Sequence, residues 1–249
     1  MLAPMHAILT GTTRGVGLAL ALELIRRGLR VTGIARGDCP AELESPHYHH
    51  VRLDLSDLES SEVPLRELVR SVLASNPKRV ALVNNAGSLQ PMRPLTRCEP
   101  RELQSAMTLN VTTPMWLSAH LLAECGETEL RIVNLSSGAA TSAYPGWGAY
   151  CAGKAALSMV DRVLAIEAVE YPELEGSDFA VLTYAPGVVA TEMQGEIRAS
   201  SVVDFPRRAR FVELHEAGQL VERAAPALEI AEWLHESANG CSETRRFGA

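Results

Sequence analysis

Residues 10–17 read Thr-Gly-Thr-Thr-Arg-Gly-Val-Gly and stand between a short apolar run at residues 6–10 and an amphipathic stretch at residues 16–27. Glycines let a backbone approach a bound pyrophosphate, and the amino end of the following helix offers free N–H groups and a partial positive charge. The spacing is GxxxGxG, which differs from the GxGxxG of many dinucleotide folds and lacks the Lys-Ser/Thr pair of a P-loop. We therefore expect a nucleotide to bind at this turn.

Apolar runs recur along the chain and alternate with longer helical stretches. The runs lie at residues 6–10, 30–35, 51–55, 79–83, 130–135 and 179–184, and the amphipathic stretches lie at 16–27, 63–74, 102–123, 149–169 and 225–235. The runs are continuously apolar, as is typical of parallel strands that are buried on both faces. Their regular succession with helices predicts an α/β fold with a doubly wound, Rossmann-type parallel sheet and helices on both faces.

The chain has 249 residues and contains no repeat, no low-complexity segment and no linker that would divide it. We therefore expect a single domain over residues 1–249. Residues 187–220 interrupt the succession between the last apolar run and the last helix. Ligands of open α/β sheets bind beyond the carboxyl ends of the strands, so we expect this segment to form a substrate lid, with a plain surface excursion as the alternative.

The composition limits the partners and the compartment that we expect. The net charge of −7 gives no general attraction to nucleic acid or to an anionic membrane, and no apolar stretch reaches the ~20 residues of a bilayer span. Five cysteines are scattered without a CxxC pair, which is typical of reduced thiols in a cytoplasmic protein. The run His47-Tyr48-His49-His50 lacks an obvious carboxylate or thiol partner, so we predict no metal site.

The residues after the second apolar run bear on which nucleotide binds. A carboxylate there would accept a hydrogen bond from the ribose 2′-OH of NAD, whereas a cation would pair with the 2′-phosphate of NADP. This chain has Arg36 at that point and a second cation, Arg14, within the glycine turn. Two guanidinium groups are suited to hold a phosphate, so we predict NADP(H) as the cofactor. Two alternatives remain: both arginines are solvated surface groups, or Asp38 accepts the ribose hydroxyl.

Tyr150 and Lys154 occupy positions i and i+4 of an expected helix, so they lie one turn apart on the same face. A tyrosine with a pKa near 10 is a poor proton donor at neutral pH. A lysine cation about 5 Å away favours the phenolate by on the order of 3 kcal/mol, which corresponds to roughly two pK units. Lys154 is also one of two lysines in a chain with 23 basic residues. The pair therefore predicts general acid–base chemistry.

Polar residues upstream of this pair extend the expected site. Ser137 follows the run at 130–135, and residues 138–148 can loop back so that its hydroxyl and that of Tyr150 converge on a substrate oxygen. The sequence Asn-Asn-Ala-Gly at 84–87 ends the fourth run. Asn110 lies within an expected helix, where its low helix propensity indicates either a place in the site or a bend or cap.

These segments, in this order and spacing, resemble the short-chain dehydrogenase/reductase family across nearly the whole chain: TGTTRGVG, NNAG, Asn110, Ser137, YCAGK at 150–154, and Pro186-Gly187 with Thr191. The resemblance implies that a hydride passes from the reduced cofactor to a carbonyl carbon while Tyr150 protonates the oxygen. Lys154 would lower the pKa of Tyr150 and bond to the nicotinamide ribose. Ser137 would orient the carbonyl, and Asn110 would hold a water in a proton relay. The implied catalytic residues are thus Asn110, Ser137, Tyr150 and Lys154.

The same resemblance implies further contacts with the cofactor. Asp54 matches the family's contact with the adenine amine, the NNAG segment lines the cofactor, and the segment after Pro186 covers the nicotinamide. Together with the glycine turn and Arg36, the expected NADP(H)-binding residues are Gly11, Thr13, Arg14, Gly15, Val16, Gly17, Arg36, Asp54, Asn84, Ala86, Gly87, Tyr150, Lys154, Pro186, Gly187, Val189 and Thr191.

A narrower resemblance covers mainly the carboxyl-terminal half. Residues 146–147 (GW), 150–155, 184–187 (YAPG), 191–194 (TEMQ) and 214–221 (LHEAGQLV) are similar to sepiapterin reductases and to the related bacterial benzil reductases. This implies a flat aromatic carbonyl substrate that contacts Ser137, Tyr144, Trp147 and Met193, although ordinary lid packing also explains the last three. Sepiapterin reductases hold the pterin with an aspartate where this chain has Thr244. An aromatic ketone or 1,2-diketone therefore suits the chain at least as well as a pterin.

The leading hypothesis is an NADPH-dependent carbonyl reductase for a small molecule. A non-catalytic Rossmann module that senses NADP(H) is the main alternative, and intact Ser137, Tyr150 and Lys154 argue against it. A sugar-nucleotide epimerase is disfavoured by the GxxxGxG spacing and by the short length. The family resemblance further implies a homodimer or homotetramer that forms through the helices at residues 102–123 and 149–169.

Overall fold

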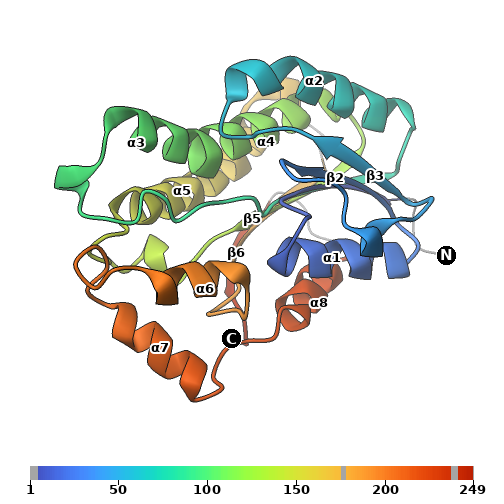
Figure 1. Ribbon diagram of the computed structural model, residues 1–249. Helices are drawn as coiled ribbons and strands as arrows, with labels where there is room; N and C mark the ends of the chain where they lie inside the picture. Colours follow the sequence, from blue (N-terminus) through green and yellow to red (C-terminus); the bar gives the residue numbers. More distant parts are fainter. Residues whose placement is uncertain (1–4, 175–177, 237–240, 249) are drawn as a thin grey trace.

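The computed structural model describes residues 5–174, 178–236 and 241–248, and its centre is a seven-stranded sheet (Figure 1). The strands are β1 (Met5–Thr10), β2 (Arg30–Ala35), β3 (Tyr48–Arg52), β4 (Arg79–Asn84), β5 (Glu129–Leu135), β6 (Phe179–Ala185) and β7 (Cys241–Arg246). All neighbouring strands are parallel, and their order is β3-β2-β1-β4-β5-β6-β7. This doubly wound order confirms the expected Rossmann-type fold.

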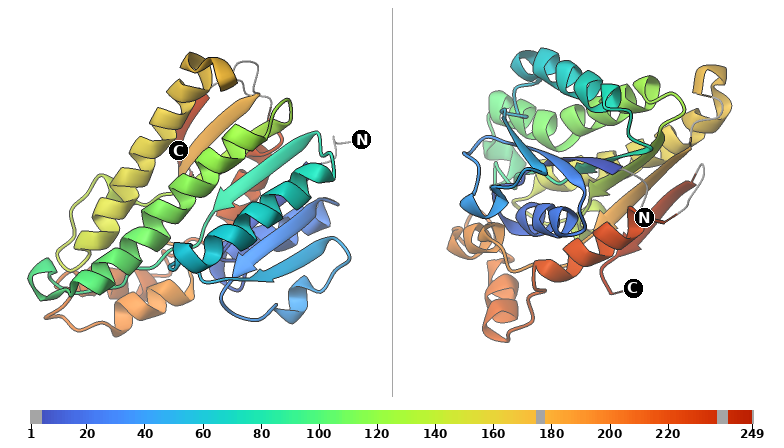
Figure 2. Two further views of the ribbon diagram at one scale, coloured as in Figure 1. Left: turned by 90° about the horizontal axis from the view of Figure 1, so that it is seen from above. Right: turned by 90° about the vertical axis from the view of Figure 1, so that its right-hand side faces the viewer.

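Helices cover both faces of the sheet (Figure 2). They are α1 (Gly15–Arg26), α2 (Leu58–Ala74), α3 (Pro100–Met107), α4 (Thr113–Glu124), α5 (Gly148–Glu170), α6 (Glu192–Ala199), α7 (Arg208–Glu216) and α8 (Ala224–Trp233). Side chains alternate across each strand, so Ala7 and Leu9 of β1 belong to a core shared with α1 and α8. Ile8 between them belongs to a second core, shared with α2, α4 and α5. Both faces are thereby buried, which explains the continuous apolar runs.

Two strands differ from what the apolar runs predict. β3 spans Tyr48–Arg52, three residues earlier than the run at 51–55, because polar side chains contribute to its interactions. The Tyr48 hydroxyl lies 2.8 Å from Thr12 Oγ1, and His50 Nε2 lies 2.9 Å from the Gly37 carbonyl oxygen. β7 has the sequence CSETRR, and as an edge strand beside β6 it needs no apolar run.

The helical stretch at 102–123 is two helices rather than one. A π-helical turn at Thr108–Thr112 joins α3 to α4, and Asn110 lies within it. The low helix propensity of Asn110 therefore does mark an interruption of the helix. This interruption brings the Asn110 amide to the segment after β4, where it donates to the Ser88 carbonyl oxygen at 3.0 Å and accepts from the Ser88 N–H at 3.1 Å.

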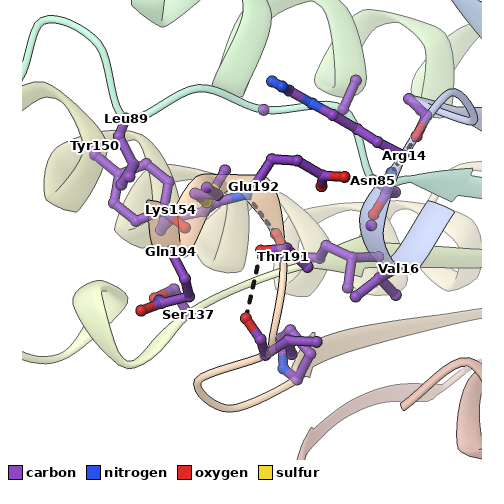
Figure 3. A pocket seen from close by; sticks show the side chains of 18 of the residues that line it. Arg14, Val16, Asn85, Leu89, Ser137, Tyr150, Lys154, Thr191, Glu192 and Gln194 are labelled. Carbon is purple, nitrogen blue, oxygen red and sulfur yellow. Dashed lines mark hydrogen bonds between the residues drawn. The ribbon is translucent and has the colours of Figure 1, made fainter. Parts of the chain in front are cut away.

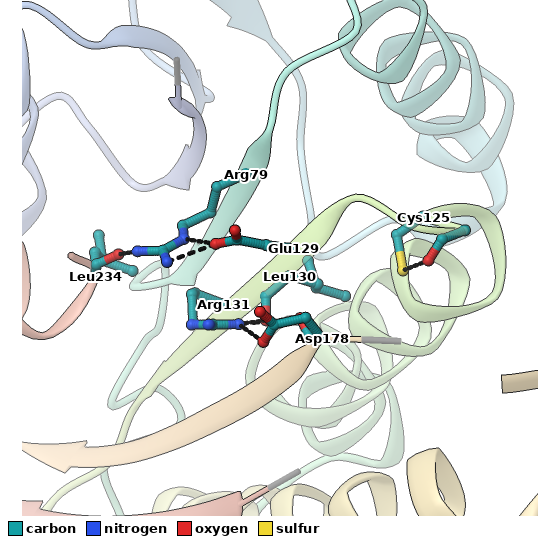
Figure 4. A network of polar contacts seen from close by, with 8 residues as sticks. Arg79, Cys125, Glu129, Leu130, Arg131, Asp178 and Leu234 are labelled. Carbon is teal, nitrogen blue, oxygen red and sulfur yellow. Dashed lines mark hydrogen bonds and ion pairs between the residues drawn. The ribbon is translucent and has the colours of Figure 1, made fainter. Parts of the chain in front are cut away.

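Ion pairs join the strands at their amino ends (Figure 4). Arg79 at the start of β4 pairs with Glu129 at the start of β5, at 2.5 Å, and donates to the Leu234 carbonyl oxygen at 2.7 Å. The buried Arg131 pairs with Asp178 at 2.8 Å. These contacts link β4 to β5, and β5 to the residue that precedes β6, at the end of the sheet opposite the carboxyl ends of the strands.

Helices α6 and α7 lie side by side beyond the sheet, within the segment that we expect to be a lid (Figure 1).

Within the ranges that the structure describes, no helix has both the length and the apolar character needed to cross a bilayer.

Candidate active site

A cavity of about 540 Å³ lies beyond the carboxyl ends of the strands, as is usual for ligand sites of open α/β sheets. It extends from the glycine turn and the end of β2 to the start of α5, and α6 and α7 contribute to its wall. Most residues expected in the site line it: Gly11, Thr13, Arg14, Gly15, Val16, Arg36, Asp54, Ala86, Gly87, Ser137, Tyr144, Trp147, Tyr150, Lys154, Pro186, Gly187, Val189, Thr191 and Met193. The remaining three, Gly17, Asn84 and Asn110, do not line it.

The turn between β1 and α1 depends on its glycines. Gly11 and Gly15 have φ angles of +74° and +59°, in the left-handed region that favours glycine. A Cβ on Gly17 would lie 2.2 Å from the Gly11 carbonyl oxygen, so Gly17 is needed for close packing of α1 against the turn. Arg14 is the N-cap of α1 and makes no side-chain capping bond. An uncapped helix amino end at the cavity wall is what a pyrophosphate requires.

Two arginines lie at the end of the cavity that this turn forms. Arg36 Nη1 is 3.8 Å from Asp54 Oδ2, and Arg14 Nη2 is 3.5 Å from Glu196 Oε1. Both guanidinium groups are more than half exposed, so these long ion pairs are weak and leave donors for a ligand. Asp38 pairs instead with Arg52 at 3.0 Å and does not line the cavity. The alternative in which Asp38 accepts a ribose hydroxyl therefore has no support from this arrangement.

Asp54 reaches the cavity from the loop after β3. Burial opposes its ionisation, but hydrogen bonds from the Ser56 side chain and backbone and the charge of Arg36 give it a net lowered pKa. The two bonds from Ser56 measure 2.6 and 2.9 Å and both reach Oδ1. Asp54 is thus held as an anion beside Arg36.

At the opposite end of the cavity, Tyr150, Lys154 and Ser137 come together (Figure 3). Helix α5 presents Tyr150 and Lys154 on one face, and the Lys154 Nζ lies 5.6 Å from the centroid of the Tyr150 ring. Lys154 Nζ also donates to the Leu135 carbonyl oxygen at 2.5 Å, which ties it to the end of β5. Ser137, just past β5, forms a hydrogen bond with the Tyr150 hydroxyl that lowers the phenol's pKa. The geometry thus brings together the two hydroxyls and the ammonium.

Burial dominates the acid–base properties of this pair. It raises the pKa of Tyr150 to about 12, against the smaller effect of Ser137, and it lowers the pKa of Lys154 to about 8. Our expectation that the lysine charge brings the phenol below its ordinary pKa is therefore not met in the free protein. The spacing of the two residues does not reveal that both are almost completely buried, and this desolvation penalises both charged forms.

Asn110 lies behind the cavity wall. A Cβ placed on Gly87 would lie 3.0 Å from Asn110 Oδ1 and 3.7 Å from Lys154 Nζ, so Gly87 separates the two side chains. Gly153 of α5 packs against the Asn110 side chain from the other direction. Asn110 therefore fixes the β4 loop relative to α5, and its expected role in a water relay stays a prediction.

Asn84 differs from what we expect of a cofactor-lining residue. Its side chain is buried and donates to Ser118 Oγ at 3.1 Å and to Asn134 Oδ1 at 2.7 Å. Asn84 is the last residue of β4, and its side chain lies on the face of the sheet that α4 and α5 cover. The next residue, Asn85, lines the cavity instead. The Asn85 amide donates to the carbonyl oxygens of Thr10 and Gly11 and thereby supports the glycine turn.

An aromatic cluster surrounds the end of the cavity that holds Tyr150. Trp147 is in edge contact with Tyr150, with ring centroids 5.8 Å apart, and Tyr144 lies 5.0 Å from Trp147. Phe211 of α7 contacts both Tyr144 and Trp147 and lines the cavity. Our sequence reasoning included Tyr144 and Trp147 but missed Phe211, for which the available signal was an aromatic residue within the expected lid. It also missed Gln194 and Leu89, which line the same region.

The chemistry of the residues that line the cavity suits a dinucleotide. One end offers two arginines and an uncapped helix amino end, the middle is lined by the backbone of Ala86 and Gly87, and the other end holds the Tyr150 hydroxyl. Among the described residues, no group of three or more His, Cys, Asp or Glu side chains is arranged to hold a metal ion.

The sequence and fold match known proteins over most of their length. The family model described as short chain dehydrogenase matches residues 5–201. The chain is 34% identical over 225 residues to benzil reductase ((S)-benzoin forming) from Bacillus cereus, covering 87% of this chain and 88% of the relative. It is 30% identical over 255 residues to sepiapterin reductase from Xenopus laevis, covering 95% and 93%. A short chain dehydrogenase/reductase structure from Saccharomyces cerevisiae superimposes with a TM-score of 0.80 at 24% identity, covering 97% and 95%.

Proposed function

The chain belongs to the short-chain dehydrogenase/reductase family and is an oxidoreductase acting on CH–OH/C=O groups, and within that family we propose that it is an NADPH-dependent reductase of aromatic ketones or 1,2-diketones. The observation that carries the proposal is the position of Tyr150, Lys154 and Ser137 at one end of a cavity that has two arginines at the other. A proton donor and a site for an anionic nucleotide thus share one cavity.

NADP(H) is the proposed cofactor because the cations Arg14 and Arg36 lie where its 2′-phosphate would bind. The glycine turn and the amino end of α1 would hold the pyrophosphate, and Pro186, Gly187, Val189 and Thr191 would cover the nicotinamide. When bound, the reduced nicotinamide supplies the hydride that the protein itself lacks. Asp54 would contact the adenine amine.

The side chains at the other end handle the carbonyl oxygen. Ser137 donates a hydrogen bond that orients the carbonyl, and Tyr150 delivers its hydroxyl proton to the oxygen as negative charge develops there. A phenol whose pKa is about 12 is fully protonated at neutral pH and so is ready to donate. The Lys154 ammonium stabilises the phenolate that remains.

The walls around Tyr150 support the proposed substrate class. Trp147, Tyr144 and Phe211 give a largely apolar, aromatic surface, to which Met193 adds a polarizable side chain. One of the relatives described above is named a benzil reductase and another a sepiapterin reductase, and each of these substrates has a carbonyl group conjugated with a ring system.

A pterin is the less favoured of these two substrates. Thr244 and Glu243 of β7 do not line the cavity. Glu243 accepts hydrogen bonds from Trp233 Nε1, at 3.1 Å, and from Arg245, so its carboxylate is already engaged. No carboxylate from β7 is therefore placed to hold pterin amino groups.

Residues 187–220 are proposed to act as the substrate lid. Met193 of α6 and Phe211 of α7 both line the cavity and belong to the same aromatic and apolar cluster as Trp147. The segment thereby covers the region where a substrate would contact Tyr150.

The purified protein with NADPH and a panel of benzil, simple aryl ketones and sepiapterin tests the proposal. We expect NADPH oxidation to be fastest with the diketone, and product chromatography to show the hydroxyketone. Exclusive turnover of sepiapterin would overturn the substrate preference. Tight NADPH binding with no turnover of any carbonyl would favour the alternative of a non-catalytic NADP(H) sensor.

We also propose a homodimer or homotetramer. Helix α5 exposes Met159, Val163, Ile166 and Val169 along one face, and α4 exposes Met115. A row of apolar side chains at helical spacing on neighbouring helices is suited to pack against a second copy of the chain.

A further inference from the structure

A carboxylate that the proposed reaction does not use is buried in the helix that carries the catalytic pair. Asp161 of α5 has no solvent-exposed surface. It follows Lys154 by seven residues, which is two helical turns, so the two side chains emerge on the same face of α5. An ionisable group so completely buried is costly unless its charge is compensated.

Both oxygens of the Asp161 carboxylate accept a hydrogen bond from the sheet. Asn134 Nδ2 of β5 donates to Oδ1, and Thr183 Oγ1 of β6 donates to Oδ2. The Asn134 amide is itself oriented, because its Oδ1 accepts from Asn84 Nδ2 at 2.7 Å. A donor directed at each carboxylate oxygen is the arrangement that an ionised carboxylate requires.

The charge that this carboxylate faces is Lys154. The Lys154 ammonium is buried and donates to the carbonyl oxygen of Leu135, the residue that follows Asn134 in β5. Attraction between the two charges raises the pKa of Lys154 and lowers that of Asp161, in each case against the larger, opposing effect of burial. The net pKa values, about 8 and about 6, leave a range between them in which both groups are charged.

The other groups around Asp161 do not compete for this role. The side chains that β4, β5, β6 and α4 contribute to the same hydrogen-bonded chain are Asn84, Asn134, Thr183 and Ser118, none of which ionises in this range. On α5, the titratable neighbours of Lys154 are Tyr150 and, through Tyr150, Cys151. Among these groups, Asp161 is the anion.

We propose that Asp161 is a positioning residue, the buried counter-charge that keeps Lys154 protonated beneath Tyr150. The network of Asn84, Asn134 and Thr183 holds this anion in place behind the site. Without it, Lys154 would be a buried cation with no anionic partner, and the neutral amine would be favoured. The kinetic test below rests on the proposed carbonyl reductase activity, whereas the stability test does not.

The kinetic test is the pH profile of kcat/KM for NADPH-dependent reduction in Asp161→Asn. Removing a negative charge lowers the proton affinity of the coupled Tyr150 and Lys154 pair, whichever of the two loses its proton first. We expect the alkaline limb to move to lower pH by about one unit, so that kcat/KM falls about tenfold at a pH above the limb and changes little below it. A limb at the wild-type pH would overturn the proposal.

A matched control removes a hydrogen-bonded carboxylate elsewhere. Glu229 of α8 accepts from the buried Tyr184 hydroxyl at 2.6 Å, on the opposite face of the sheet. Glu229→Gln is expected to keep the wild-type limb, and an equal shift in both variants would contradict the inference. Should Asp161→Asn not fold, Asp161→Ser removes the same charge with a smaller side chain and is expected to move the limb in the same direction. No movement in that variant would count against the proposal.

The stability test is a thermal double-mutant cycle at pH 7 that needs no substrate. We expect Asp161→Asn to lower Tm by roughly 3 °C more in the wild-type background than in Lys154→Met, because the counter-charge has nothing to compensate once the lysine is gone. Equal changes in the two backgrounds would refute the pairing. If no carbonyl is reduced but the cycle shows this coupling, the proposed carbonyl reductase activity is refuted, whereas the proposal that Asp161 is the counter-charge of Lys154 is supported.

Discussion

The indole of Trp147 lies parallel to the phenyl ring of Phe205, with centroids 4.5 Å apart and planes 5° apart. Trp147 directly precedes helix α5 and touches Tyr150, while Phe205 belongs to the segment between α6 and α7. The proposed lid is therefore packed against the start of α5, the helix that carries the proposed proton donor Tyr150. Lid side chains that line the cavity should consequently affect substrate binding more than they affect the chemical step.

Phe211→Ala tests this relationship, because Phe211 is the aromatic residue of α7 that faces the cavity. Loss of its ring contacts is expected to raise KM for an aromatic carbonyl about tenfold, which corresponds to roughly 1.4 kcal/mol, with kcat and the KM for NADPH changed much less. Steady-state kinetics with benzil measure the three constants. Val203→Ala, in the same segment but highly exposed, is the control. An unchanged KM in Phe211→Ala would exclude α7 from the substrate site.

Tyr150→Phe is expected to lower kcat by at least about 10³-fold, because it removes the proton donor while retaining the ring and its contact with Trp147. NADPH binding, measured by fluorescence titration, should stay within a few-fold of wild type. Tyr171→Phe removes a hydroxyl from an exposed tyrosine just past the other end of α5 and should leave both quantities unchanged. Substantial turnover by Tyr150→Phe would show that another group supplies the proton.

The arrangement of Tyr150 and Lys154 could be predicted because a four-residue spacing on a helix fixes which side chains share a face. The glycine turn was equally accessible, since its position between the first strand and helix is local in sequence. The pKa of Tyr150 could not be predicted in this way, because it depends on burial by α6, α7 and the segment between them, which lie far away along the chain. Phe211 was missed for the same reason.

At the two edges of the sheet, continuous apolar runs do not predict the strands. The edge strands β3 and β7 carry polar side chains that bond to neighbouring segments, so neither matches a continuous apolar run. Asn84 shows a finer limit, because the sequence places it next to the cavity but only the pleat of β4 decides which of Asn84 and Asn85 faces it.

Cofactor selection is expected to depend on Arg14 and Arg36. Replacing either arginine by alanine should raise the KM for NADPH about tenfold, because one cationic partner of the 2′-phosphate is lost. The KM for NADH should stay nearly unchanged, because NADH has no 2′-phosphate. The KM ratio of the two cofactors measures the effect, and increasing salt should weaken NADPH binding in wild type more than in the double variant. Arg101→Ala on α3 is a control outside the cavity. A wild-type preference for NADH would reverse the assignment.

Acid stability is expected to depend on His6 of β1. Burial, with the nearby charges of Arg30 and His49, lowers its pKa from 6.5 to about 4, and its Nε2 lies 2.9 Å from Thr32 Oγ1. Between these pH values the unfolded chain binds more protons than the folded one, so the free energy of unfolding falls as the pH drops from 6.5 to 4. We expect a loss on the order of 2 kcal/mol from this group after solvent screening.

Urea unfolding of His6→Gln at pH 7 and pH 4.5 measures this contribution. The amide can keep a hydrogen bond to Thr32 and does not titrate, so the variant should match wild type at pH 7 and exceed it at pH 4.5. His47→Gln, at an exposed position just before β3, should show no such crossover. Parallel losses in wild type and His6→Gln would assign the acid sensitivity to other groups.

The exposed apolar face of α5 is the proposed contact between copies of the chain. Ile166 and Val163 are 55% and 43% exposed and lie one turn apart, so a charge placed there meets the proposed interface with a second copy. Ile166→Glu is expected to shift the wild-type dimer or tetramer to monomer, since an unpaired buried carboxylate costs several kcal/mol at each symmetric contact. Multi-angle light scattering over a range of concentrations measures the mass. Val63→Glu on α2 is the control, because Val63 is 62% exposed and lies outside α4 and α5. A monomeric wild type would contradict the proposal directly, and a dimer that survives Ile166→Glu would place the interface on another face.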